Sequence, residues 1–184
     1  MQPKITLELL TSRNFARVRE IQRDDICEAF VDTVDTLMEI TRYGLEQACK
    51  GHTYAVKLGE AYVGVILLGE VIAWDTDPEE MRSRPFYRLM GFVLDKRYRG
   101  RGIGGYVLET VIGQIYEEFG PRPIALGVHR DNVDAARFYL RHGFRRTDAM
   151  EGEDVYYLRY PEEQDARWAW GEERQHTAEK RRTP

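Results

Sequence analysis

The order of apolar patterns along the chain predicts a mixed α/β fold, with a central and mostly antiparallel sheet of about seven strands covered by helices. Two early strand patterns flank a compact turn at Leu58-Gly59-Glu60, which is typical of an antiparallel hairpin. A strand, a helix and another strand between Phe86 and Val128 need a parallel crossover. Hairpins and a crossover in one chain therefore indicate a mixed sheet.

The first half of the chain contains three strand patterns and two helix patterns. Ile5–Leu9 alternates apolar and polar residues, as a half-buried strand does. Ser12 is a suitable N-cap for the first helix, and Gly51 is a natural end for the second. The expected elements are a strand over Ile5–Leu9, a helix that carries Phe15, Val18 and Ile21, a helix over Leu37–Cys49, and strands over Thr53–Lys57 and Ala61–Val71.

The second half predicts the crossover and a final hairpin. A helical apolar stripe follows a glycine-rich segment, and Gly120-Pro121 ends that helix. Residues 151–154 form the turn of the last hairpin. The expected elements are a loop over Trp74–Pro85, strands over Phe86–Leu94 and Ile124–Val128, helices over Tyr106–Phe119 and Val133–Arg141, and strands from Phe144 onward and over Val155–Tyr160.

The length and the composition indicate one domain over residues 1–160. A chain of 184 residues suffices for one sizeable core and is marginal for two. Residues 161–184 are rich in charged residues and Gln, with Trp168 and Trp170 as the large apolar side chains. We expect this tail to be partly disordered or lightly docked, and it could pack on a partner in a homodimer.

The charge and cysteine content exclude several classes of protein. A net charge of −4 argues against nucleic-acid binding, which needs a basic surface. Cys27 and Cys49 provide neither a disulfide framework nor a zinc motif, and His129 and His142 lack metal-ligand spacing, so no metal is expected. The apolar-rich stretch Ala61–Trp74 is interrupted and too short to span a membrane. With no signal-peptide pattern, we expect a soluble, cytoplasmic protein.

A glycine-rich loop, Arg99–Gly105, lies between the predicted fourth strand and the following helix. Such a loop turns its backbone N–H groups inward, and the helix start adds the positive end of a dipole, so phosphate is the natural ligand. Glycine permits both close backbone approach and positive φ. Arg99 and Arg101 would add positive charge beside the phosphates.

Three interpretations of this loop compete. Gly100, Gly102 and Gly105 fit the dinucleotide pattern G-x-G-x-x-G, but His129 and Arg130 follow the next strand where a ribose-binding acid is expected. A P-loop is excluded because Gly-Lys-Ser/Thr is absent. The loop alone could also be a connector without a ligand.

A second motif decides between these interpretations. The pattern Arg-x-x-Gly-x-Gly, from Arg99 to Gly104, resembles the acyl-CoA pyrophosphate loop of the GCN5-related N-acetyltransferases (GNAT). The segment from Asn132 to Phe144 resembles the Asn…Ala…Tyr…Gly-Phe signature of the same family, in the correct order and about 30 residues on. The element order resembles the family over roughly Ile5–Tyr160, while its specific residues lie between Phe92 and Phe144.

The resemblance implies acetyl-CoA as cosubstrate, a ternary complex with direct attack by an amine, and fourth and fifth strands that splay apart. Tyr139 is then the catalytic acid that protonates the leaving thiolate. Asn132 would also cap its own helix. The implied cofactor-binding residues are Phe92, Val93, Leu94, Arg99, Gly100, Arg101, Gly102, Ile103, Gly104 and Asn132.

No single residue stands out as the general base that deprotonates the amine. Asp95 follows the cofactor strand, where a charged residue is usually solvated. His129 at a strand end is a minor candidate, and the other carboxylates are expected to be surface charges. These further candidates are Glu28, Asp32, Asp35, Glu70, Asp75 and Asp77.

Local similarity favours a small cationic acceptor. Glu28-Ala29-Phe30-Val31 and the stretch from Tyr87 to Asp95 resemble the diamine and polyamine acetyltransferase branch, although Met90 and Gly91 depart from it. Carboxylates on the acceptor side would suit a polycation. A peptide or protein amine is the alternative acceptor, an acyl-CoA sensor without catalysis is the alternative of another class, and a dehydrogenase is a third.

Overall fold

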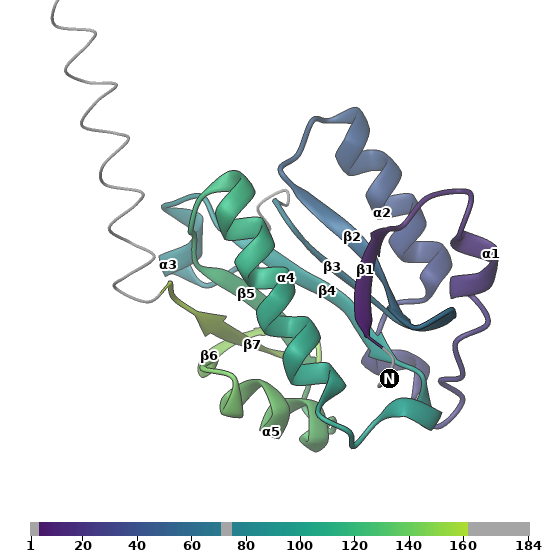
Figure 1. Cartoon of the computed structure of the whole chain (residues 1–184). Coiled ribbons are helices and arrows are strands. Elements are labelled where there is room, and N and C mark those ends of the chain that lie inside the picture. The colour runs from purple at the N-terminus through teal and green to yellow at the C-terminus, as the bar shows by residue number, and fades with distance from the viewer. Residues whose placement is uncertain (1–3, 71–74, 162–184) are drawn as a thin grey trace, which may run out of the picture.

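The computed structural model describes residues 4–70 and 75–161, and it contains one seven-stranded sheet in the order β1-β2-β3-β4-β5-β7-β6 (Figure 1). Of the six strand pairs, β4–β5 is parallel and the other five are antiparallel. This confirms the predicted mixed sheet. The strands are β1 (Ile5–Leu9), β2 (Gly51–Leu58), β3 (Ala61–Gly69), β4 (Tyr87–Leu94), β5 (Ile124–His129), β6 (Arg145–Glu151) and β7 (Asp154–Arg159).

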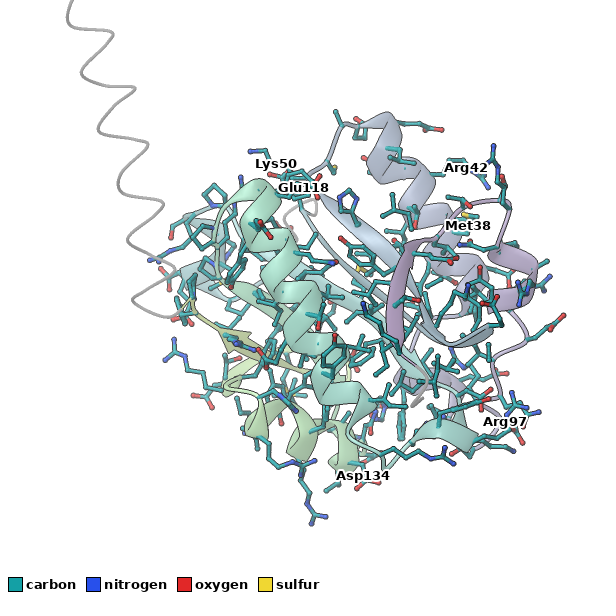
Figure 2. All side chains as sticks on the ribbon, in the orientation of Figure 1. Met38, Arg42, Lys50, Arg97, Glu118 and Asp134 are labelled. Atoms are coloured by element: carbon teal, nitrogen blue, oxygen red, sulfur yellow. The ribbon has the colours of Figure 1, made fainter. Side chains whose placement is uncertain are left out.

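Helices cover both faces of the sheet. Figure 1 shows α4 crossing one face with α5 beside its amino-terminal end, while α1 and α2 lie on the other side. Charged side chains such as Arg42 and Asp134 project outward from these helices (Figure 2). The helices are α1 (Phe15–Val18), α2 (Val34–Glu46), α3 (Glu79–Arg82), α4 (Ile103–Phe119) and α5 (Val133–Arg141), with 3₁₀ turns η1 (Glu28–Phe30) and η2 (Lys96–Tyr98).

Most buried apolar residues form two cores, one on each face of the sheet, and a small third cluster joins Met81, Phe86, Ala125 and Leu158. The larger core joins α4 and α5 to the sheet, and the apolar stripe of α4 predicted from the sequence, including Leu108, Val111 and Ile115, is buried in it. The smaller core joins α1 and α2 to the opposite face, where Leu37 of α2 is fully buried with Val65 and Val93. Along β2, Tyr54 and Val56 serve the larger core and Ala55 between them serves the smaller one, as the period of a strand requires.

Several element boundaries differ from the predictions. The first helix is a single turn that begins after Asn14, not Ser12, and Asn14 Oδ1 accepts the backbone N–H of Thr11. The second helix starts three residues earlier than expected, because the Thr33 hydroxyl accepts the backbone N–H of Thr36. It ends at Glu46, and Ala48 adopts a positive φ of 53°. The Thr33 cap therefore accounts for the earlier start of the second helix, whereas the first helix starts without a side-chain cap.

Two further differences concern the second half. The predicted loop between Trp74 and Pro85 contains the short helix α3. The helix after the glycine-rich loop begins at Ile103, so Ile103 and Gly104 belong to it. Val71, Trp74, Trp168 and Trp170 lie outside the described residues, as does the tail from residue 162. The division into a domain over 1–160 and a tail stays a prediction.

Candidate active site

The centre of the site is a β-bulge in β4. Val65 of β3 pairs with Val93, whereas Leu67 pairs with Met90, so β4 contains one extra residue at this point. Gly91 lies in the bulge with a φ of +56°, and a Cβ atom there would come within 2.4 Å of Leu37. Only glycine fits both the backbone conformation and the approach of α2.

The bulge changes which residues of β4 face α4 and α5. Leu89 before the bulge and Phe92 and Leu94 after it all pack in the larger core, although a regular strand would turn Leu89 and Phe92 to opposite faces. Val93 packs in the smaller core instead. The bulge therefore aims Phe92 and Leu94 at the side where the glycine-rich loop and α5 lie.

Beside the bulge, β4 and β5 separate. Their pairing is limited to Tyr87 with Ile124 and Arg88 with Ala125, although both strands continue well beyond these residues. The later part of β4 pairs with β3 but with no strand on its β5 side within the described sheet. This confirms the expected splay, and it leaves main-chain groups along Phe92–Leu94 without a strand partner on that side, where the Leu94 carbonyl accepts a side-chain donor, Arg99 Nε.

The loop that follows β4 has the properties of a phosphate site. Gly100 and Gly102 have φ values of 74° and 77°, and a Cβ atom at either position would meet nothing within 4 Å. Gly102 is the N-cap of α4 and provides no capping side chain, so the first-turn N–H groups of this helix keep their hydrogen-bonding capacity. These open glycines at a helix start fit the pyrophosphate of coenzyme A.

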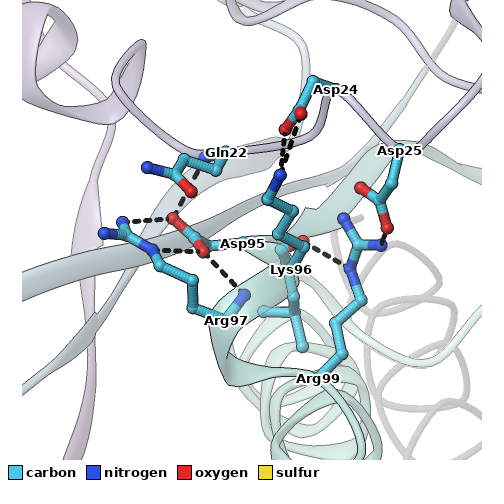
Figure 3. Close-up of polar contacts among 8 residues, drawn as sticks. Gln22, Asp24, Asp25, Asp95, Lys96, Arg97 and Arg99 are labelled. Atoms are coloured by element: carbon cyan, nitrogen blue, oxygen red, sulfur yellow. Dashed lines mark hydrogen bonds and ion pairs between the residues drawn. The ribbon is translucent and has the colours of Figure 1, made fainter.

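The two arginines of the loop differ in their surroundings. Arg99 donates from Nε to the Leu94 carbonyl at 2.8 Å and from Nη1 to Asp25 at 2.6 Å (Figure 3). Arg101 lies over the ring of Tyr98, with 5.7 Å from its guanidinium carbon to the ring centroid, and is exposed. Arg99 thus ties the loop to its surroundings, and a phosphate contact by either arginine stays a prediction.

The remaining glycines of the motif bring α4 against α5. A Cβ atom at Gly104 would lie 3.4 Å from the Phe138 ring, and one at Gly105 would lie 2.7 Å from the His142 ring. Phe138 also lies 6.0 Å from Phe92, measured between ring centroids. Gly105, the third glycine of the dinucleotide pattern, is therefore required by helix packing rather than by a phosphate.

Tyr139 lies next to this contact on α5. Its side chain is 8% exposed, and its ring packs against Phe138 and Phe144 with centroids 5.2 and 5.4 Å away. Burial raises the pKa of its hydroxyl. A neutral phenol on a largely buried side chain is suited to donate a proton.

Asn132 begins the same helix. Its Oδ1 accepts the backbone N–H of Ala135 at 3.2 Å, which confirms the expected N-cap. Capping by itself accounts for an asparagine at this position, and contact with the cofactor stays a prediction.

Asp95, a candidate base, has a structural role. It is fully buried, and it accepts hydrogen bonds from the Arg97 guanidinium and from the backbone N–H groups of Arg97 and Gln22. These donors, Arg97 first, lower its pKa well below the usual range of an aspartate. The expectation of a solvated side chain was wrong, and a carboxylate of such low basicity is a poor proton acceptor.

Three more candidate bases are held in ion pairs. Asp77 is buried with Arg88 and accepts the Tyr156 hydroxyl at 3.2 Å, so it is not the surface charge that the sequence predicted. Glu70 pairs with Arg122 and accepts the backbone N–H of Lys50. Asp35 pairs with Arg19 at the surface, 3.0 Å away. These contacts give each carboxylate a structural explanation.

A group of carboxylates near the end of β5 was only partly foreseen. Burial raises the pKa of Asp154, and repulsion from Glu151, Asp32 and Glu153 raises it further. Of these four residues, only Asp32 was considered as a site residue, because residues 151–154 formed a hairpin turn in the sequence pattern. His129 opposite Asp154 is enclosed by Phe30, 5.0 Å between ring centroids, and by Glu153.

Comparison with known proteins places this geometry in a family. Residues 16–144 match the model of the acetyltransferase (GNAT) family. The spermine/spermidine N(1)-acetyltransferase of Bacillus subtilis is 31% identical over 124 residues, which cover 64% of this chain and 78% of the relative.

Solved structures show the same fold. The PaiA N-acetyltransferase of Thermoplasma acidophilum in complex with coenzyme A has a TM-score of 0.65 at 17% identity, covering 86% of this chain and 99% of that one. A GNAT family acetyltransferase of Elizabethkingia anophelis with acetyl-CoA bound has a TM-score of 0.55 at 16% identity, covering 85% and 98%.

A bulged strand, a splayed neighbour and a glycine-rich helix start are the features of an acyl-CoA-dependent transferase. With the family match over more than half of its length, the chain belongs to the GNAT family of acetyltransferases. It is an acetyl-CoA-dependent N-acetyltransferase.

Residues 4–70 and 75–161 lack two features that mark other classes of protein. No helix in these ranges is long and apolar enough to cross a membrane. Nor do they contain a group of three or more His, Cys, Asp or Glu side chains arranged to hold a metal ion.

Proposed function

We propose that this enzyme acetylates a primary amine of a polyamine or a similar small cation, by direct attack in a ternary complex. The observation that carries the proposal is the convergence, at the β4–β5 separation, of the bulge at Gly91, the open glycines before α4 and the buried phenol of Tyr139. Acetyl-CoA supplies an activated thioester, and the remaining steps fall to residues of this chain.

Cofactor binding rests mainly on the backbone. The unpaired edge of Phe92–Leu94 is suited to pair with the amides of the pantetheine arm, while Gly100, Gly102 and the first turn of α4 with Ile103 and Gly104 are suited to hold the pyrophosphate. Arg99, Arg101 and Asn132 complete the proposed set. A backbone N–H of the β4 edge would also stabilise negative charge on the thioester carbonyl.

The transfer forms a bond between the amine nitrogen and the acetyl carbon and breaks the bond between that carbon and sulfur. The amine nitrogen releases one proton to solvent, and the leaving thiolate takes one proton from the Tyr139 hydroxyl. The raised pKa keeps that hydroxyl protonated before the reaction, and the proton released by the amine restores it afterwards, so no net proton is gained or lost by the enzyme. Holding both reactants in one site removes the entropic cost of their encounter.

The carboxylates near β5 support a cationic acceptor. Burial raises the pKa of Asp154, His129 opposes that rise, and the charges of Glu151 and Asp32 add to it, so an ammonium group bound near these carboxylates would be attracted to them. The similarity to a bacterial enzyme named for spermine and spermidine points the same way. We further propose a cytoplasmic enzyme that acts without nucleic-acid or membrane partners. Analytical ultracentrifugation tests whether it forms a homodimer.

The decisive experiment measures thiol release from acetyl-CoA with a panel of amines: spermidine, spermine, putrescine and lysine peptides. Asp154→Asn should raise the KM for spermidine roughly fivefold, the equivalent of about 1 kcal/mol for one charge pair near a surface. Asp148→Asn on exposed β6 is the matched control and should leave KM unchanged.

The same substitution has a stability signature. Because the folded-state pKa of Asp154 is raised, its protonated form stabilises the fold below pH ~4, and that contribution is lost as the pH rises. Asp154→Asn should therefore be at least as stable as the wild type at pH 7, so a higher KM cannot reflect unfolding. Turnover of lysine peptides alone would favour a peptide acceptor, and tight coenzyme A binding without turnover would favour a sensor.

A further inference from the structure

A strap formed by residues 22–32, between α1 and α2, is fastened to the cofactor loop. Asp25 pairs with Arg99 at 2.6 Å, and Asp24 pairs with Lys96 at 2.8 Å (Figure 3). The backbone of Gln22 donates to Asp95 at 3.0 Å and accepts the N–H of Lys96 at 2.9 Å. The strap therefore follows the loop that connects β4 to α4.

The other end of the strap reaches β5. The Arg23 guanidinium donates to the carbonyls of Val31 and Asp32, which folds the strap back on itself. This fold places the Phe30 ring against His129, at the end of β5 where Asp154 pairs with it. One short segment thus connects the loop proposed for pyrophosphate with the carboxylates proposed for the acceptor.

Arg99 makes only some of the hydrogen bonds that its guanidinium group can donate. Its Nε and Nη1 atoms have partners, but Nη2 is buried and has no hydrogen-bond partner among the described residues. An arginine fixed on two sides retains one strong donor, and charge-assisted bonds from guanidinium groups are both strong and directional. Arg99 is thus positioned to donate a further hydrogen bond when anionic oxygens bind to the loop.

We propose that Asp25 is a positioning residue. Through its ion pair with Arg99, it causes the strap to become ordered when coenzyme A binds the loop. This inference rests on the proposed function, because it takes the glycine-rich loop to be the pyrophosphate site. Bound phosphates fix the loop, the fixed loop holds Arg99, and Arg99 holds Asp25 and with it the acceptor end of the strap. Such coupling is reciprocal, so an ordered strap also favours cofactor binding.

The test is amide hydrogen exchange of residues 22–32 with and without coenzyme A, with its affinity measured by calorimetry. In the wild type, coenzyme A should slow exchange across the strap. Asp25→Asn should abolish most of this slowing, leaving exchange about fivefold faster than in the liganded wild type, the upper range for a partly exposed ion pair. Coenzyme A affinity should stay within about threefold, because Arg99 keeps its charge.

Three variants serve as companions. Asp25→Glu retains the charge and should restore the slowing, which loss of a merely structural contact would not predict. Asp25→Ser repeats the test with a smaller side chain, should Asp25→Asn be poorly folded. Glu80→Gln removes a comparably exposed ion pair between α3 and Arg145 of β6 and should leave exchange in the strap unchanged.

The outcomes separate this inference from the proposed function. Binding of coenzyme A without slower exchange in the wild-type strap would overturn the coupling alone, as would full slowing in Asp25→Asn. A wild-type protein that does not bind coenzyme A would overturn both. Because the readout needs no turnover, the identity of the acceptor amine does not enter the test.

Discussion

The two halves of β4 illustrate how one strand serves two purposes. Tyr87 and Arg88 in the first half pair with β5, and β3 pairs with the strand on its other side. The second half, Phe92–Leu94, pairs with β3 alone. Pairing with β5 ends at Arg88, and the bulge at Gly91 separates this paired half from the open half that follows it. The paired half fixes the strand on both sides, whereas the main chain of the open half is the part proposed to bind the cosubstrate.

The largest effect is expected beside the open half. Tyr139→Phe should lower kcat by at least about 100-fold, in the range of general acid catalysis, while the affinity for coenzyme A stays nearly unchanged. Steady-state kinetics and calorimetry measure the two quantities. Tyr43→Phe, an exposed tyrosine on α2, is the matched control. An unaltered kcat would remove Tyr139 from the mechanism.

Gly91, which separates the two halves of β4, is expected not to tolerate any side chain. Gly91→Ala places a Cβ atom 2.4 Å from Leu37 at a positive φ, and should cost about 1–3 kcal/mol of the free energy of unfolding. The shifted strand should also lower kcat. Gly113→Ala, at an exposed position of α4 where a Cβ atom meets nothing within 4 Å, should be neutral or stabilising. Chemical denaturation of both variants tests the contrast.

The end of the open half depends on Asp95. Asp95→Asn should lower the free energy of unfolding by about 2 kcal/mol at pH 7, since it removes charged hydrogen bonds to Arg97 and to Gln22. The folded-state pKa of Asp95 is lowered, so its contribution is complete above the unfolded pKa of about 4 and is lost as the pH falls. The difference in the free energy of unfolding between variant and wild type should therefore narrow as the pH falls below about 4. A gap independent of pH would contradict this role.

The smallest effect is expected in the paired half. The Tyr87 hydroxyl donates to the carbonyls of Phe119 and Gly120 at the end of α4. Tyr87→Phe should cost about 1 kcal/mol of stability and leave kcat and KM unchanged. A kinetic effect equal to that of a change in the open half would show that the two halves are not separate.

The sequence was most informative where function depends on local backbone chemistry. The glycines of the loop, the Asn132 cap, the stripe of α4 and the order of the main elements along the chain follow from residues close together in the chain, and each is found in the structure. The splay of β4 and β5 came from the family resemblance rather than from periodicity, and the register now shows it. The roles of the individual site residues stay predictions.

The features that were missed depend on contacts across the fold. Gly91 attracted notice only as a departure from a family pattern, because the need for glycine arises from the register with β3 and from Leu37 of α2. Asp95 could not be assigned without knowing that Gln22 lies beside it. The carboxylates of residues 151–154 resembled an ordinary turn until the structure placed them near Asp32.

The separation of β4 from β5 also bears on aggregation. An unpaired strand edge at the rim of a sheet invites pairing with other chains, and proteins usually protect it. Here the unpaired edge of Phe92–Leu94 lies inside the sheet order, with three further strands beyond it. The open edge is therefore not at the rim of the sheet, where a strand of another chain would pair most easily. The same arrangement that is proposed to serve the cosubstrate would thus also guard against edge-to-edge association.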